Sequence, residues 1–126
     1  MGDEAMSATI DHIGLNVTDY EKGKAFYAAA LKPLGLSVLS DYGVVVGIGG
    51  DFPFLWVSAG NPGHVHLAFR AETRKQVDAF YAAAMAAGAK DNGKPGIRSE
   101  YSENYYAAFV LDPDGHNIEA VCHAPE

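Results

Sequence analysis

The sequence predicts an α+β protein made of two βαβββ modules, and two observations support this prediction. The first is an internal repeat: residues 25–30 (AFYAAA) recur as residues 79–84, and the same offset of 54 residues aligns His12 with His66. Seven identities in one register indicate a duplication rather than two alanine-rich helices that agree by chance. The second is the order of the predicted elements, which is strand, helix and further strands in both halves.

Each half opens with a strand that leads into a helix. Residues 10–17 and 65–69 are rich in β-branched and apolar side chains, which favours strands. Thr18 with Glu21, and Thr73 with Gln76, have the spacing of a capping box at a helix start. Apolar residues then recur at helical spacing. They form the stripes Phe26, Tyr27, Ala30, Leu31 and Leu34, and Val77, Phe80, Tyr81, Ala84 and Met85.

Each predicted helix is followed by residues that end it and then by further strands. Pro33 and Gly35 end the first helix, and Gly88 ends the second. The predicted strands are residues 36–39, 44–48 and 54–57 in the first half, and 105–111 and 117–122 in the second. Residues 112–115 (DPDG) form a turn between the last two strands, whereas residues 91–96, with two glycines and a proline, are predicted as a loop.

Length and composition indicate one compact domain. The 126 residues, 48% of them hydrophobic, are enough for a single core. We therefore expect one domain over residues 1–126, with module one at about 8–60 and module two at about 64–124. The single cysteine, Cys122, excludes an internal disulfide framework, and its strand position predicts a packed thiol rather than a nucleophile.

The net charge and the hydropathy of the sequence limit the kinds of binding partner that we expect. A net charge of −7 disfavours nucleic acid and anionic lipid. The acidic start, residues 1–5, is not followed by the apolar segment of a signal peptide, and no apolar run is long enough to cross a bilayer. We expect a cytoplasmic protein that binds neither nucleic acid nor membrane.

Several segments together resemble the vicinal oxygen chelate superfamily, which includes glyoxalase I, extradiol dioxygenases, methylmalonyl-CoA epimerase, fosfomycin-resistance thiol transferases and bleomycin-resistance proteins. They are residues 11–17 (DHIGLNV), 66–69 (HLAF) and 111–119 (LDPDGHNIE), with the paired Phe-Tyr helices. The resemblance implies the glyoxalase/bleomycin resistance/dioxygenase fold, in which two βαβββ modules form a curled mixed-sheet cup. It also implies a homodimer. Whether the modules of one chain share a cup, or are exchanged between chains, is left open by the sequence.

The resemblance also implies a metal site. Carried over by position, the ligands are His12, His66 and Glu119, and the ion is a divalent Fe, Mn, Zn or Ni. The fourth position falls in residues 54–57, which contain no carboxylate, and Trp56 stands near it. Two imidazoles and one carboxylate leave open positions for a ligand with two neighbouring oxygens. Taken singly, however, each histidine has the alternative of a strand-end residue, and Glu119 that of an exposed strand carboxylate.

Four further residues are candidates for substrate binding: Trp56, Arg98, Tyr101 and Tyr105. Aromatic side chains suit an apolar or aromatic ligand, and an arginine suits a carboxylate or phosphate. The alternative is that the tyrosines are core or dimer contacts. His64 and His123 are expected to be exposed, and His116 to be a turn residue.

Two functions from different classes fit these features. The first is a metal-dependent lyase, isomerase or dioxygenase acting on a small molecule with vicinal oxygens. The second is a metal-free protein that binds or sequesters a small molecule, as bleomycin-resistance proteins do. A thiol transferase ranks lower because no cluster of basic residues is evident for a phosphonate. If Trp56 points into the cup, glyoxalase I activity itself should be weak or absent.

Overall fold

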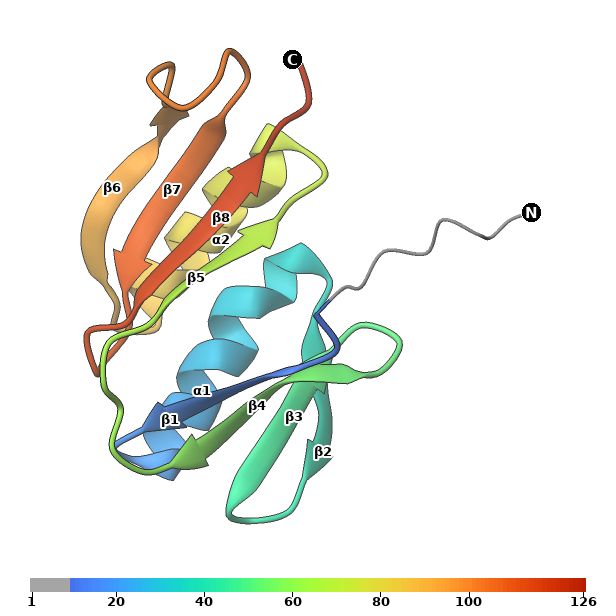
Figure 1. The fold of residues 1–126 in the computed structure, drawn as a ribbon, viewed down its shortest axis with the longest axis vertical. Coiled ribbons are helices and arrows are strands. Elements are labelled where there is room, and N and C mark those ends of the chain that lie inside the picture. The colour runs from blue at the N-terminus through green and yellow to red at the C-terminus, as the bar shows by residue number, and fades with distance from the viewer. Residues whose placement is uncertain (1–9) are drawn as a thin grey trace.

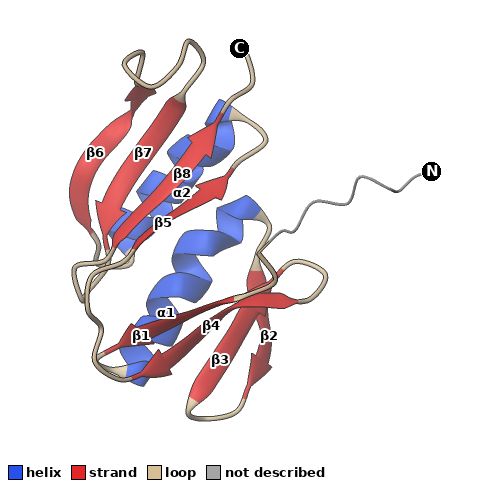
Figure 2. Ribbon diagram, in the orientation of Figure 1, coloured by secondary structure: helices blue, strands red, loops and turns tan. Residues whose placement is uncertain are grey.

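The computed structural model describes residues 10–126; the prediction for the acidic start, residues 1–5, lies outside this range. Two βαβββ modules follow one another, which confirms the predicted α+β fold (Figures 1 and 2). Module one contains β1 (Ile13–Val17), α1 (Tyr20–Leu31), the short 3-10 helix η1 (Lys32–Leu34), β2 (Ser37–Asp41), β3 (Val45–Gly49) and β4 (Pro53–Ala59). Module two contains β5 (His66–Arg70), α2 (Arg74–Ala86), β6 (Lys90–Ile97), β7 (Tyr106–Leu111) and β8 (Asn117–Cys122).

Each module forms its own four-stranded mixed sheet. The strand orders are β1-β4-β3-β2 and β5-β8-β7-β6. In both sheets the first and last strands of the module pair in parallel, and the remaining pairs are antiparallel. The two sheets remain separate and open, so a single chain does not close them into one barrel.

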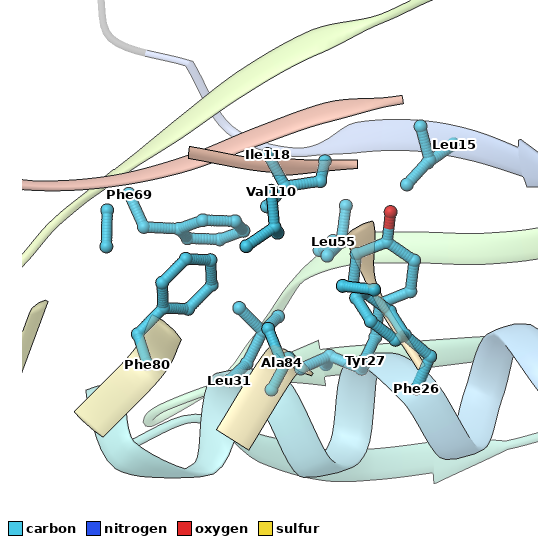
Figure 3. Packing of buried hydrophobic residues seen from close by; sticks show 14 of the residues in the cluster. Leu15, Phe26, Tyr27, Leu31, Leu55, Phe69, Phe80, Ala84, Val110 and Ile118 are labelled. Atoms are coloured by element: carbon cyan, nitrogen blue, oxygen red, sulfur yellow. The ribbon is translucent and has the colours of Figure 1, made fainter. Parts of the chain in front are cut away.

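One core lies between the helices and both sheets. Helices α1 and α2 pack side by side, and both sheets cover them from the same side (Figures 1 and 3). Leu15 and Leu55 of the first sheet, and Val110 and Ile118 of the second, all point toward this helix pair (Figure 3). Cys122 is buried in the same core, as predicted. The opposite side of each sheet is here called its helix-free face.

The first helix begins one residue later than predicted. Asp19, in an extended conformation, is the N-cap, and its side chain accepts a hydrogen bond from the backbone N–H of Lys22 at 3.1 Å. The predicted capping box of Thr18 and Glu21 is therefore wrong. The Thr18 hydroxyl donates instead to Asp114, in the turn of module two. A short polar side chain bonds whichever partner the tertiary fold brings near, which sequence spacing does not reveal.

The second helix begins as predicted. The Thr73 side chain is the N-cap and accepts from the backbone N–H of Gln76 at 3.1 Å. Gly88, with φ of +105°, follows the helix end in the left-handed region that glycine tolerates. Neither α1 nor α2 is long and apolar enough to cross a membrane, and residues 10–126 contain no other helix that is.

Strand β6 is the largest departure from prediction, because residues 91–96 were expected to form a loop. The strand lies at the edge of the second sheet, and its register with β7 shifts on both sides of Gly93. Gly93 has φ of +153°, and Pro95 leaves no N–H to pair. An edge strand tolerates glycine, proline and bulges, so residues that usually break strands are accommodated here.

The turn of module two joins the two modules through buried polar contacts. The Tyr27 hydroxyl of α1 donates to the carboxylate of Asp112, which is 4% exposed and also accepts the backbone N–H of His116 at 2.8 Å. The His116 ring, predicted as an ordinary turn residue, is fully buried. Its Nδ1 accepts from the N–H of Val65 at 3.1 Å, and its Nε2 lies 2.9 Å from the carbonyl of Asn16. One ring therefore links β1 to the start of β5.

Candidate metal site and ligand pocket

The helix-free face of the second sheet carries a histidine and a carboxylate on neighbouring strands. Side chains alternate along a strand, so Ile118 and Ala120 in the core direct Glu119 to the other face. In the same way, Phe69 in the core leaves His66 on the helix-free face of β5. The parallel pairing of β5 with β8 then places His66 Nε2 3.1 Å from Glu119 Oε1.

Glu119 is enclosed although it does not face the helices. It is 1% exposed, and the Tyr105 hydroxyl donates to its Oε2. Desolvation, followed by the hydrogen bond to Glu119, raises the pKa of Tyr105 to about 12. The phenol therefore stays protonated at neutral pH and remains a donor to this oxygen. Tyr101 and His123 pack edge-on against the Tyr105 ring, at centroid distances of 5.0 and 5.3 Å.

The two nitrogens of His66 have different partners. Nδ1 lies 3.1 Å from the backbone carbonyl of Asn117, which only accepts, so the hydrogen-bond network assigns the proton to Nδ1. In the neutral ring, Nε2 then presents a lone pair to Glu119 Oε1, which is also an acceptor. Two acceptors this close need a cation between them, either a proton on Nε2 or a metal ion. Ligand atoms roughly 2.0–2.2 Å from one ion lie about 3 Å apart, so the pair fits two positions of a metal site.

His12 does not join this pair within the chain. It precedes β1, its side chain is 60% exposed, and its Nδ1 lies 2.7 Å from Asp11 Oδ1. Across residues 10–126, no three His, Cys, Asp or Glu side chains of one chain gather where they could hold an ion. The packing explains this result, because helices α1 and α2 contact each other and the strands of the two modules form two separate sheets.

Trp56 occupies the counterpart of the Glu119 position. Gly14 of β1 pairs with Trp56, and Ala68 of β5, which the repeat aligns with Gly14, pairs with Glu119. Trp56 lies on the helix-free face of the first sheet, because its neighbours Leu55 and Val57 are in the core.

The Trp56 ring is held in place by its neighbours. It stacks on Tyr42 at a centroid distance of 6.3 Å. It also covers Gly47, where an added Cβ would come within 2.6 Å of the ring.

The other predicted binding residues lie on the second sheet. Arg98 and Tyr101 line a cavity of about 280 Å³ next to His66, and Tyr105 reaches Glu119. Sequence reasoning missed the other five residues that line this cavity: Asn92, Gly93, Glu100, Phe109 and Asn117. Asn117 could have been found, because it lies two residues before Glu119 and therefore on the same face. Asn92 could not, because its strand was predicted as a loop.

Comparison with known proteins identifies the family. Residues 9–120 match the model of the Glyoxalase/Bleomycin resistance protein/Dioxygenase superfamily, and the chain belongs to this superfamily. No curated protein matches the chain.

Solved structures show the same fold. A glyoxalase/bleomycin resistance protein from Albidiferax ferrireducens is 28% identical with a TM-score of 0.77, and the match covers 90% of this chain and 98% of that one. The fosfomycin resistance protein FosX from Listeria monocytogenes is 18% identical with a TM-score of 0.72, and 94% and 96% are covered. A lactoylglutathione lyase from Agrobacterium tumefaciens is 19% identical with a TM-score of 0.69, and 93% and 95% are covered.

Proposed function

We propose that this protein is a metal-dependent enzyme that acts on a small molecule with two neighbouring oxygens, in a lyase, isomerase or dioxygenase reaction. The observation that carries the proposal is the His66–Glu119 pair, in which Nε2 and Oε1 lie 3.1 Å apart. Members of the superfamily with such a ligand set commonly use a divalent ion. Bound here, the ion would act as a Lewis acid toward the two oxygens of the substrate.

The residues around His66 and Glu119 orient these two side chains for the proposed metal binding. The carbonyl of Asn117 fixes the His66 ring and its tautomer, as the outer partners of metal-binding histidines usually do. Tyr105 donates to Glu119 Oε2, so Oε1 is the oxygen that faces His66. The Phe109 ring stacks on the His66 ring at 6.3 Å and limits the access of water from that side.

The third ligand in this proposal is His12 of a second copy of the chain. The buried contacts of Tyr27 and His116 hold the two modules in one arrangement, so the chain's own His12 stays away from its own Glu119. A homodimer would bring the helix-free face of one module one against that of a second module two. Several large apolar residues of module one are exposed and available for such contact: Val38, Leu39, Tyr42, Val44 and Phe52.

A second function is favoured by one specific observation. Both oxygens of Glu119 already have partners within the chain, Tyr105 and His66. With a proton on Nε2, the pair is satisfied without any metal. The same pocket would then bind and sequester a small molecule without chemistry.

Metal analysis of the purified protein separates the two functions. The enzyme proposal predicts about one divalent ion per chain, which His66→Ala removes. His64→Ala is the matched control, because His64 is exposed and lies just before β5. Unchanged metal content in His66→Ala would contradict the proposed site.

Activity assays test the reaction class. Vicinal diols, 2-hydroxy ketones and catechols should be converted by the metal-loaded protein and not after chelation. Turnover of methylglyoxal with glutathione should stay weak or absent, because Trp56 stands where a fourth ligand would be. Ligand binding that is unaffected by chelation, with no turnover, would favour sequestration.

A further inference from the structure

The cavity beside the candidate metal site has its own cationic group. It measures about 280 Å³, and its lining residues are Asn92, Gly93, Arg98, Glu100, Tyr101, Phe109 and Asn117. It adjoins the candidate ligands, because Phe109 stacks on His66 and the Asn117 carbonyl contacts His66 Nδ1 at 3.1 Å. A molecule that reaches the metal site with one end can therefore place its other end in this cavity.

Arg98, which directly follows β6, is fixed there by the backbone of that strand. One terminal nitrogen donates to the carbonyl of Gly96 at 2.8 Å, and the other donates to the carbonyl of Lys94 at 2.7 Å. The guanidinium also lies over the Phe109 ring, at 5.4 Å from its centroid. These bonds use two of its five N–H donors and leave the others for a ligand. Among residues 10–126, Arg98 forms no ion pair, so its charge is not neutralised by the described chain.

Two glycines make room for this arrangement. A Cβ at Gly93 would lie 3.1 Å from one terminal nitrogen of Arg98 and 2.9 Å from the Phe109 ring. A Cβ at Gly96 would lie 3.2 Å from the other terminal nitrogen. The bulged, glycine-containing strand β6 therefore leaves the space that the guanidinium occupies.

We propose that Arg98 binds a carboxylate of the substrate, so that the substrate is a small planar acid that also carries two neighbouring oxygens. This proposal rests on the proposed function and names its substrate class. The planar fork of arginine matches a carboxylate, and the aromatic rings of Tyr101 and Phe109 in the cavity lining favour a flat molecule. A doubly charged phosphate fits less well, because the cavity holds one arginine together with Glu100 and the chain carries a net charge of −7.

The test compares three probes on the purified full-length protein by calorimetry: catechol, 3,4-dihydroxybenzoate and benzoate. The first has the vicinal oxygens, the third has the carboxylate, and the second has both. Wild type should bind 3,4-dihydroxybenzoate about tenfold or more tightly than catechol, as expected for a charged hydrogen-bonded pair. Arg98→Gln should remove this preference, because it weakens the binding of 3,4-dihydroxybenzoate far more than the binding of catechol.

The control and a second variant keep the test decisive. Lys94→Gln removes the same charge from the adjoining strand β6 without touching the cavity lining, and should retain the preference. Arg98→Lys keeps the charge but loses the fork, and should reduce the preference. If Arg98→Gln unfolds, as thermal melting would show, the wild-type preference and Arg98→Lys still decide the question.

The outcomes separate this proposal from the function on which it rests. If wild type binds catechol and 3,4-dihydroxybenzoate equally, or if Arg98→Gln retains the preference, the role of Arg98 is overturned and the vicinal-oxygen site stands. If benzoate and 3,4-dihydroxybenzoate bind equally and catechol does not bind, Arg98 is supported and the vicinal-oxygen site fails. If none of the three binds, both proposals are overturned.

Discussion

The two modules pair their first and last strands in the same register, but they carry different side chains at corresponding positions. On the last strand of each module, Trp56 stands in module one where Glu119 stands in module two. On the adjacent strand, the partner of Trp56 is Gly47, whereas the partner of Glu119 is Phe109. Each of these two residue pairs thus contains one aromatic ring, but on different strands.

This difference between the two residue pairs explains why only the second sheet carries the candidate site. In module one the Trp56 ring lies over glycine and fills the place where a ligand side chain would project. In module two the ring sits on the neighbouring strand, and the carboxylate keeps the position next to His66. The duplication supplies the scaffold twice, and these two residue pairs determine which copy can carry the proposed site.

The largest expected effect follows directly from this comparison. Glu119→Ala should lower the affinity for a divalent ion by about 100-fold or more, because it removes a ligand and leaves the Tyr105 hydroxyl without its acceptor. Trp56→Ala, at the corresponding position, should change the affinity by no more than about threefold. Titration with Zn²⁺ or Mn²⁺ against a competing chelator measures both. Equal losses in the two variants would mean that the modules are not specialised in this way.

The aligned tyrosines of the two helices provide a second comparison. Tyr27 donates to the buried Asp112, whereas Tyr81 donates to the exposed Asp91 at 3.0 Å. Tyr27→Phe should therefore cost about 1–3 kcal/mol of unfolding free energy, because it leaves a buried carboxylate with one partner fewer. Tyr81→Phe should leave stability unchanged within error. Urea denaturation of the two variants tests this. Equal effects would contradict the role of the Tyr27–Asp112 hydrogen bond in joining the two modules.

The same pair predicts a pH dependence. Burial, together with the nearby Asp112, raises the pKa of Tyr27 above its usual 10.0. The folded state therefore keeps the phenol protonated where the unfolded chain begins to ionise, so this contribution is complete below pH 10.0 and is lost as pH rises above it. Unfolding free energies measured between neutral and alkaline pH should fall less steeply in Tyr27→Phe than in wild type. An unchanged slope would contradict this assignment.

The smallest expected effect concerns the position of the tryptophan. Gly47→Ala would push the Trp56 ring aside at a cost of about 1 kcal/mol, because the side chain and not the backbone yields. Gly14→Ala is the matched control on the same face, since an added Cβ there meets nothing within 4 Å. The chain has a single tryptophan, so its emission spectrum reports the displacement directly. Identical spectra for the two variants would show that Trp56 does not pack on Gly47.

Much of the fold could be predicted from the sequence because its determinants are local or repeated. The repeat of residues 25–30 as 79–84 predicted both modules, and the turn at residues 112–115 predicted the last hairpin. Strand β6 could not be predicted, because its glycines and proline are tolerated only at a sheet edge, and edge position is a tertiary property. The N-cap of α1 also depends on tertiary structure. Asp19 and not Thr18 is the N-cap, since the Thr18 side chain is hydrogen-bonded to Asp114 of the other module.

The candidate site was predictable in part for related reasons. Strand alternation correctly places Glu119 on the helix-free face, and parallel pairing brings His66 beside it. The separation of His12 could not be foreseen, because it depends on how the two modules pack through α1, α2 and the buried His116. Local patterns determine which face a side chain takes, but not which faces meet.

The central claim is that one metal site uses His12 of one chain with His66 and Glu119 of another. The most direct test mixes two inactive variants, His12→Ala and Glu119→Ala, after reversible dissociation. Each variant alone lacks an intact set of ligands. In a mixed dimer, the Glu119→Ala chain supplies His12 and the His12→Ala chain supplies His66 and Glu119, which restores one site.

With random exchange, half of the dimers are mixed, and the mixture should bind about a quarter of the metal bound by wild type. The measurement is metal content per chain after gel filtration, with each variant exchanged against itself as control. Recovery near this value would support a site shared between chains. A mixture that binds no more metal than the separate variants, from a sample shown to contain mixed dimers, would contradict the claim.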